Sequence, residues 1–179
     1  MSISKFKIIN SDLITHGGTS YYRKVMVHFF NFNYRLIYSY RVMKWLDKSF
    51  LSKINIFLQL KQSVIFNSYI SPKAVLGQKV KFAHAYGVII GQAKIGDGVI
   101  IFQQVTIGSH GNSLAERAWP TIGNNCKIYA GAKILGNVKI GNNCTIGANC
   151  VILRDLPDNA IVVSAPSKIV GYNDEGKSQ

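Results

Sequence analysis

"TIGNNCKIYAGAKILGNVKIGNNCTIGANCVI", residues 121–152, places an isoleucine at every sixth position from Ile122 to Ile152. Helices repeat near 3.6 residues and flat strands at 2, so neither explains a period of six. A three-sided coil does explain it, because each side is a short strand plus a turn and three sides take 18 residues. Such coils stack about 4.8 Å apart. The slot four residues after each isoleucine holds a small apolar side chain: Cys126, Ala132, Val138, Cys144 and Cys150.

The same period continues upstream in a different phase. Ile89, Ile95, Ile101 and Ile107 lie six residues apart, and one corner near 88–89 must absorb an extra residue. Fifteen residues separate Ile107 from Ile122 where 12 would keep the phase, so 108–120 is expected to form a loop. The sequence therefore predicts a mainly β fold, a left-handed parallel β-helix of hexapeptide repeats. Its expected range is 61–171, with 172–179 as a polar C-terminal tail.

Residues 1–60 follow different rules and are expected to form an N-terminal helical segment. They hold nine Lys/Arg against two acids, and 12 of the 20 aromatic residues. One apolar helix face is predicted from spacings of three and four; it comprises Val25, Phe29, Phe32, Leu36, Tyr40 and Met43. This helix either caps the β-helix or packs in an oligomer, or it contacts an anionic membrane surface. Nucleic acid is not expected as a partner, because no recognition motif follows.

The composition indicates a protein of the cytoplasm. If residues 1–60 contact a membrane, the protein is expected to be peripheral on the inner face of the plasma membrane. No run of about 18 apolar residues predicts a spanning helix. The first residues, MSISKFKIINSD, lack the apolar stretch and cleavage site of a signal peptide. Three cysteines at no metal-like spacing indicate reduced thiols.

Three stretches carry a family resemblance: FAHAYGVIIGQAKIGDGVIIFQQVTIG (82–108), PTIGNNCKIYAGAKILGNVKIG (120–141) and APSKIVG (165–171). Together they resemble serine O-acetyltransferases among the hexapeptide-repeat acyltransferases. The chain looks closer still to the short O-acetyltransferases of bacterial polysaccharide synthesis, of the colanic acid type. The resemblance implies acetyl-CoA as co-substrate and a homotrimer with coenzyme between neighbouring subunits.

Acetyl transfer to a hydroxyl needs a base and donors for the tetrahedral oxyanion. The family's catalytic histidine matches His84 in "AHAYG", so His84 is expected to be the general base. The family's preceding aspartate falls on Ala83, its orienting acid on Tyr69 and its second histidine on Trp119. Because these acids and the histidine hold the amino acid in serine acetyltransferases, the departures argue for a different acceptor.

Acceptor contacts are expected from Trp119, His110 and Tyr69. Trp119 either stacks on a sugar ring or pins the loop. His110 either contacts the thioester region or acceptor, or is solvated in the loop. By motif match, the residues expected at the coenzyme are Gly108, Ser109, Ala130, Ala148 and Lys168.

The function expected from these residues is transfer of acetyl to a sugar hydroxyl of a bacterial surface polysaccharide or its lipid-linked precursor. Capsule, O-antigen and exopolysaccharide remain open as the polymer. Serine O-acetylation is the alternative among enzymes, and a non-catalytic β-helix scaffold is the alternative outside them. No metal is expected, because a β-helix metal hydratase needs about three histidine ligands and the repeat region holds only His84 and His110.

Overall fold

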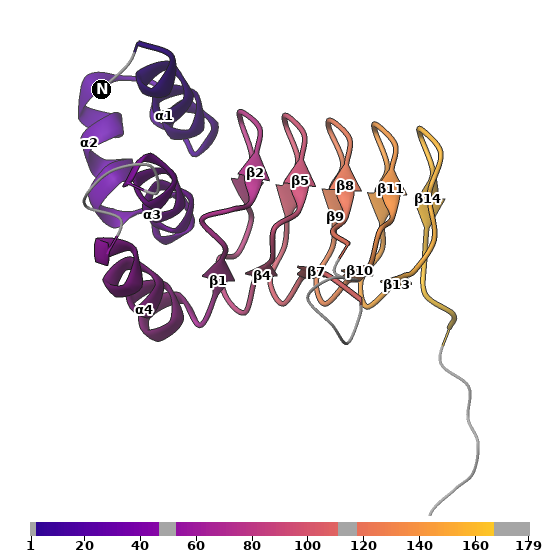
Figure 1. Cartoon of the computed structure of the whole chain (residues 1–179). Coiled ribbons are helices and arrows are strands. Elements are labelled where there is room, and N and C mark those ends of the chain that lie inside the picture. The colour runs from indigo at the N-terminus through magenta and orange to yellow at the C-terminus, as the bar shows by residue number, and fades with distance from the viewer. Residues whose placement is uncertain (1–2, 47–52, 111–117, 167–179) are drawn as a thin grey trace, which may run out of the picture.

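The computed structural model describes residues 3–46, 53–110 and 118–166, and these ranges form a helical cap followed by a parallel β-helix (Figure 1). The described helices are α1 (Ile3–Thr15), α2 (Tyr21–Phe30), α3 (Phe32–Leu46) and α4 (Asn55–Phe66). The described strands are β1 (Tyr69–Ile70), β2 (Val75–Leu76), β3 (Lys81–Phe82), β4 (Ile89–Ile90), β5 (Lys94–Ile95), β6 (Ile100–Ile101), β7 (Thr106–Gly108), β8 (Thr121–Ile122), β9 (Lys127–Ile128), β10 (Lys133–Leu135), β11 (Lys139–Ile140), β12 (Thr145–Ile146), β13 (Val151–Ile152) and β14 (Ile161–Val162).

The strands form three parallel sheets, one for each side of a triangular prism. Sheet A has the order β1-β4-β7-β10-β13, sheet B β11-β8-β5-β2 and sheet C β14-β12-β9-β6-β3. Ile122 pairs with Ile140, and Lys133 pairs with Val151, each 18 residues further along the chain. The predicted left-handed parallel β-helix with an N-terminal helical segment is confirmed.

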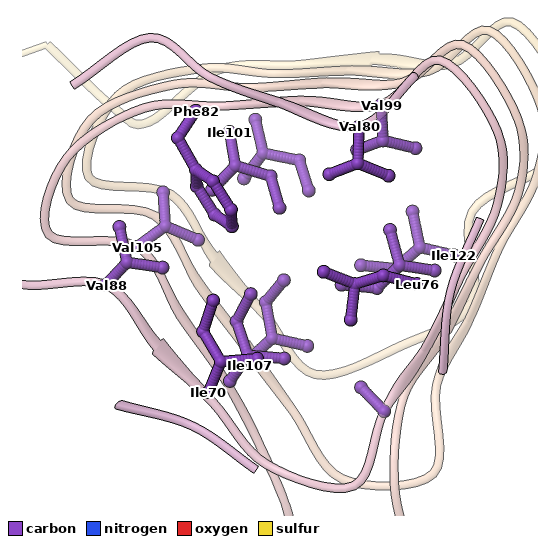
Figure 2. Close-up of a cluster of buried hydrophobic side chains, with 14 of the residues drawn as sticks. Ile70, Leu76, Val80, Phe82, Val88, Val99, Ile101, Val105, Ile107 and Ile122 are labelled. Atoms are coloured by element: carbon purple, nitrogen blue, oxygen red, sulfur yellow. The ribbon is translucent and has the colours of Figure 1, made fainter. Parts of the chain in front are cut away.

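The core of the prism is a stack of apolar side chains from all three sheets. Figure 2 shows Phe82 and Ile101 on one side of the triangle, and Leu76 and Ile122 on another. The three cysteines are buried among these side chains as free thiols. Because each coil buries one large residue per side, the stacked coils share one continuous core.

The turns between sheets B and C explain the repeated "GNN" of the sequence. Asn125 and Asn143 adopt φ of 57°, a left-handed conformation that asparagine tolerates better than most residues. The backbone N–H of Asn124 donates to Oδ1 of Asn142 in the next coil at 2.9 Å, and Asn142 donates likewise to Asp158 at 2.7 Å. This ladder holds one corner of the prism together.

The phase assigned to the upstream repeat is wrong at its first position. Ile90 is buried and pairs with Ile107, whereas Ile89 is 48% exposed. Successive residues of a strand point to opposite faces, so only one of the two can face the core. Phe82 and Ile90 are therefore eight residues apart, and the turn 83–88 between them is two residues longer than a regular turn.

The size predicted for the loop is also wrong. Lys94 in β5 pairs with Thr121 in β8, 27 residues later, where a regular coil takes 18. The chain from β7 to β8 thus makes one step between adjacent sides and carries nine extra residues, rather than the three inferred from the sequence. Residues 111–117 of this loop lie outside the described residues.

The single amphipathic helix predicted from Val25 to Met43 is wrong, because Asn31 divides it into α2 and α3. The backbone N–H of Asn31 donates to the carbonyl of Val27 at the C-terminal end of α2. The side-chain Oδ1 of Asn31 accepts from the N–H of Tyr34 at 2.9 Å. Asn31 thereby caps the first turn of α3. Met43 of α3 is buried, but α2 buries none of its residues.

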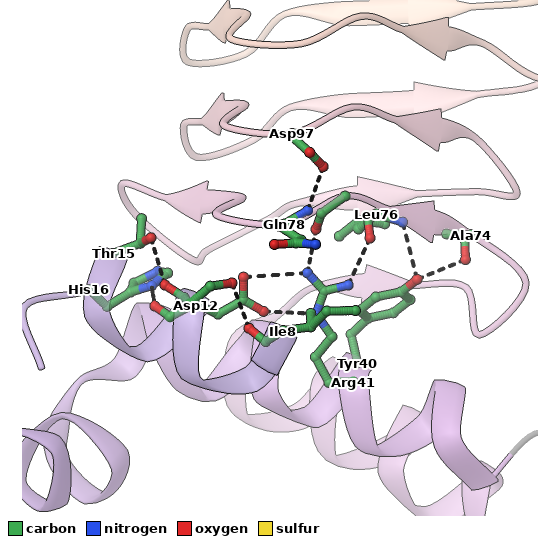
Figure 3. A network of polar contacts seen from close by, with 12 residues as sticks. Ile8, Asp12, Thr15, His16, Tyr40, Arg41, Ala74, Leu76, Gln78 and Asp97 are labelled. Atoms are coloured by element: carbon green, nitrogen blue, oxygen red, sulfur yellow. Dashed lines mark hydrogen bonds and ion pairs between the residues drawn. The ribbon is translucent and has the colours of Figure 1, made fainter. Parts of the chain in front are cut away.

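A polar network fastens the helices to the first coil (Figure 3). Arg41 of α3 donates from Nε to Asp12 of α1 at 2.8 Å, and from Nη1 to the carbonyl of Leu76 at 2.8 Å. Tyr40 donates to the carbonyl of Ala74 at 2.8 Å. The cap is thus fixed relative to the β-helix by buried and half-buried hydrogen bonds. None of the described helices is both long and apolar enough to cross a membrane.

Candidate active site

One corner of the prism, between sheets C and A, brings together His84, Ala130 and Ala148. Each follows the inward residue of its strand by two positions, in β3, β9 and β12, and those strands belong to sheet C. Gln103 occupies the same position after β6. Ala148, Ala130 and Gln103 form a column along this corner, since the N–H of Asn149 donates to the carbonyl of Ala130 and that of Gly131 to the carbonyl of Gln103. In the longer turn at the end of the column, the N–H of Gln104 bonds to Tyr86, and His84 lies two residues before Tyr86. This edge is here called the His84 corner. Its members are far apart in sequence and aligned only by the coil.

Aromatic rings lie beside this column. The ring centroid of Phe102 is 6.3 Å from that of His84 and 4.8 Å from that of Tyr129, on which it stacks at 22°. His84 itself is exposed, and Ala130 and Ala148 add little bulk. The corner therefore presents a strip of exposed and half-buried apolar side chains that leads toward an accessible imidazole.

The turn that carries His84 is held from the helical side by Asn33 of α3. The Asn33 Nδ2 donates to the carbonyl of Ala83 at 2.8 Å, and its Oδ1 accepts from the N–H of Ala85 at 2.8 Å. The Ser68 hydroxyl lies 2.8 Å from the carbonyl of Phe66 and accepts from the N–H of Val88 at 3.0 Å. Neither Asn33 nor Ser68 was found by sequence reasoning.

Tyr69 lies on the outer face of sheet A, 37% exposed, and its N–H donates to the carbonyl of Val88 at 2.8 Å. Ala83 precedes His84 and has no polar side chain. Within the described part of the chain, no hydrogen bond to the His84 ring is found. The acids that the resemblance places at positions 69 and 83 thus have no counterpart there.

Four further residues expected at the site lie at a different corner, between sheets A and B. Gly108 ends β7 of sheet A and pairs with Leu135, and Ser109 and His110 follow it. The indole of Trp119 lies across Gly91, where a Cβ atom would collide with the ring carbons. These residues form the loop corner, which sheet A separates from the His84 corner within one chain. Lys168 lies outside the described residues.

The thiols and polar groups of the described residues give no metal site. Across residues 3–46, 53–110 and 118–166, no three His, Cys, Asp or Glu side chains gather where they could hold a metal ion. Burial raises the pKa of the Cys126 thiol to about 11, which keeps it protonated and unreactive near neutral pH. The cysteines therefore belong to the core.

One groove lies among the helices rather than at the His84 corner. It is lined by Ile8, Tyr38, Arg41 and Trp45, with other residues of α1 and α3. It contains none of the residues expected in the site. The corner is an open edge of the prism in one chain, so enclosure alone does not locate the chemistry here.

Comparison with known proteins identifies what this arrangement resembles. A family model described as "Bacterial transferase hexapeptide (six repeats)" matches residues 120–154. The serine acetyltransferase of Synechococcus elongatus is 38% identical over 138 residues, which are 76% of this chain and 56% of the relative. The chain thus spans little more than half the length of that curated relative.

The solved structures that match this chain are also serine acetyltransferases. The serine acetyltransferase of Vibrio cholerae superposes with a TM-score of 0.81 at 30% identity, over 97% of this chain and 68% of that one. The Brucella abortus serine acetyltransferase in complex with coenzyme A has a TM-score of 0.79 at 31% identity, over 93% of this chain and 67% of that one.

These comparisons contradict the expectation of a sugar-hydroxyl acceptor and favour the serine alternative. The expectation rested on three positions, Ala83, Tyr69 and Trp119, where polar side chains of the amino-acid site are missing. The inference assumed that serine cannot be held without the polar side chains that serine acetyltransferases have at these positions. Similarity that extends over 138 residues and most of the fold outweighs three substitutions.

Proposed function

Because the chain belongs to the hexapeptide-repeat acyltransferase family, we propose that it transfers an acetyl group from acetyl-CoA to the hydroxyl of serine. The observation that carries the proposal is the His84 corner, which aligns the exposed imidazole with Ala130 and Ala148 along one edge. Acetyl transfer to a hydroxyl requires a base. The long pantetheine arm of acetyl-CoA requires an open surface beside that base, and the apolar strip provides one. Serine as acceptor is supported by the named relatives.

His84 acts as the general base in this proposal. A ring nitrogen of His84 takes the serine hydroxyl proton while the oxygen attacks the thioester carbonyl carbon. Collapse of the tetrahedral intermediate breaks the carbon–sulfur bond, and His84 returns the proton to the leaving sulfur. The products are O-acetylserine and coenzyme A, so atoms and protons balance without a metal or redox partner.

Ala130 and Ala148 leave space for the pantetheine arm along the corner. The backbone of neighbouring turns offers donors and acceptors at the same edge. Ser109 and Gly108 are proposed near the thioester, and Lys168 near the nucleotide phosphates. A complex of a related enzyme with coenzyme A supports this ligand class.

A homotrimer with shared sites is proposed because one chain divides the expected residues between two corners. His84 lies at one corner of the prism, whereas Ser109 and Trp119 lie at another. Two copies packed side by side bring the His84 corner of one chain against the loop corner of its neighbour. Each site would then take its base from one subunit and its loop from the next.

The proposal is tested by incubating purified protein with acetyl-CoA and serine and following thiol release together with the acetylated product by mass spectrometry. Serine-dependent thiol release with formation of O-acetylserine is expected. Binding of coenzyme A is measured separately by calorimetry. Binding without any acetyl transfer to serine would overturn the acceptor, and absence of binding would overturn the enzyme class.

The contact of residues 1–60 with an anionic membrane surface stays a prediction. Helix α2 supplies suitable residues, because Tyr21 and Phe30 are 86% and 76% exposed beside Arg23 and Lys24. Each Lys or Arg near such a surface contributes about 1 kcal/mol. Sedimentation with anionic but not neutral liposomes, lost at high salt, is the expected result. Equal sedimentation with both lipids, or none, would assign α2 to protein contacts.

A further inference from the structure

We propose that Asn33 is a positioning residue that fixes the backbone on both sides of His84, a role that rests on the proposed function of His84 as base. Its carboxamide makes two hydrogen bonds of 2.8 Å, to the carbonyl of Ala83 and from the N–H of Ala85. These are the peptide groups directly before and after His84. Asn33 reaches them from α3, 50 residues earlier in the chain.

The place of this turn in the fold explains why a side chain is needed. Later turns at the same corner bond to the preceding coil, as when Gly131 donates to the carbonyl of Gln103 at 3.0 Å. The turn carrying His84 belongs to the first coil and has no coil before it. A carboxamide carries the donor and acceptor of a peptide group. Asn33 therefore supplies the bonds that a preceding coil would make.

Asn33 is itself held firmly. It lies in the first turn of α3, which Asn31 caps. The neighbouring Phe32 stacks on Tyr86 of the same turn, with ring centroids 4.7 Å apart and planes inclined by 17°. Ser68 binds the far end of the turn through the N–H of Val88. The turn 83–88 is thus fixed at its start and middle by α3, and at its end by Ser68 between α4 and β1.

This anchoring matters because the His84 ring lacks the carboxylates that the family resemblance leads one to expect. Positions 69 and 83 hold Tyr69 and Ala83, and the ring forms no hydrogen bond with the described residues. Its direction depends on the Cα–Cβ bond of His84, which the two flanking peptides set. A displacement of about 1 Å at a reacting group can cost about 10²-fold in rate.

The test compares Asn33→Ala and the isosteric Asn33→Asp with Lys44→Met as a matched control. Lys44 also lies on α3 and bonds to carbonyls of the first coil, those of Pro72 and Ala74, but in a turn away from His84. We expect kcat to fall by about 10- to 100-fold in both Asn33 variants. Binding of coenzyme A and the KM for acetyl-CoA should change less than about twofold, because the coenzyme contacts remain.

A readout independent of activity separates this proposal from the proposed function. The His84 Cε1–H signal in NMR, assigned by its loss in His84→Ala, should move in both Asn33 variants and stay in place in Lys44→Met. An unmoved signal in folded Asn33→Ala would overturn the positioning role, whatever the activity. So would a loss of kcat in Asn33→Ala no larger than in Lys44→Met. Absence of serine acetylation by the unaltered protein, with the signal still moving, would overturn only the proposed function.

Discussion

The imidazole of His84 and the ring of Phe102 lie 6.3 Å apart, centroid to centroid, in consecutive coils of the same corner. Tyr129 stacks on Phe102 one coil further along. A ligand that reaches His84 along this corner therefore passes the small residues Ala148 and Ala130 first, and then the rings of Tyr129 and Phe102. This order of groups fixes which substitutions should block binding and which should affect the chemical step.

Filling the corner at Ala148 should block the coenzyme. Ala148 is exposed, so Ala148→Trp can fold without disturbing the core, whereas the indole occupies the space proposed for the pantetheine arm. We expect the Kd for coenzyme A to rise about tenfold or more, equivalent to about 1.4 kcal/mol. Ala148→Ser, which stays small, should bind like the unaltered protein in calorimetry. Unchanged affinity in Ala148→Trp would place the coenzyme elsewhere.

Crowding the Trp119 indole at Gly91 should destabilise the loop corner. A Cβ atom on Gly91 would meet three ring carbons of Trp119, so the indole must move. Overpacking of this kind costs about 1–3 kcal/mol. Urea unfolding of Gly91→Ala and its tryptophan fluorescence, both in a Trp45→Phe background, measure the effect.

The control for Gly91→Ala is Gly108→Ala, whose added methyl would lie 3.6 Å from Leu135, an ordinary contact. We expect its stability to change by less than about 0.5 kcal/mol. If Gly91→Ala and Gly108→Ala unfolded alike, with the same emission spectrum, the contact between Trp119 and Gly91 would be refuted.

Stability should fall in mild acid because of His16. Burial lowers the pKa of His16 below its usual 6.5, and its Nε2 is buried without a partner among the described residues. Below pH 6.5 the unfolded chain therefore binds a proton that the folded chain refuses. The free energy of unfolding falls by up to about 1.4 kcal/mol per pH unit, until the folded pKa is reached.

Urea unfolding at pH 7.5 and 5.5 checks this sign. His16→Gln should remove the part of the difference in unfolding free energy between pH 7.5 and 5.5 that His16 contributes. His28→Gln on α2 should retain that difference. An equal pH dependence in the unaltered protein and in His16→Gln would contradict the assignment to His16.

The stacked coils could be predicted because their information is local. A period of six fixes the inward residue of each side, and Ile122 and Ile140 pair as that period requires. The phase at Ile89 and Ile90 could not be resolved, since two adjacent isoleucines satisfy an apolar slot equally well. Likewise, apolar spacing continues through Asn31, and only its capping bonds divide α2 from α3.

The candidate site was reached from the sequence in part, and its roles stay predictions. His84, Ala130 and Ala148 followed from a resemblance, and counting two positions past each inward residue would have added Gln103. Asn33 had no sequence signal, because its partners lie about 50 residues away. The acceptor was misjudged because three missing polar groups were given more weight than the rest of the chain.

Shared sites in a trimer should allow complementation between inactive variants. Light scattering should give a particle of three 19.8 kDa chains. His84→Ala removes the base at one corner, and Ser109→Trp obstructs the other. Co-refolded in equal amounts, they should recover about a quarter of the activity, because one pairing of neighbours in four joins two intact corners. A mixture as inactive as its parents, or an active monomer, would contradict sharing.

The proposed role of His84 as base is tested most directly by serine-dependent acetyl transfer in the unaltered protein, His84→Ala and His110→Ala, each saturated with acetyl-CoA. We expect O-acetylserine from the unaltered protein, and a loss of about 10²–10⁴ in kcat for His84→Ala with coenzyme A binding retained. His110→Ala should lose less, because a residue in the loop is placed to position the acceptor rather than to take its proton. Full activity in His84→Ala, or a greater loss in His110→Ala, would contradict the assignment of the base.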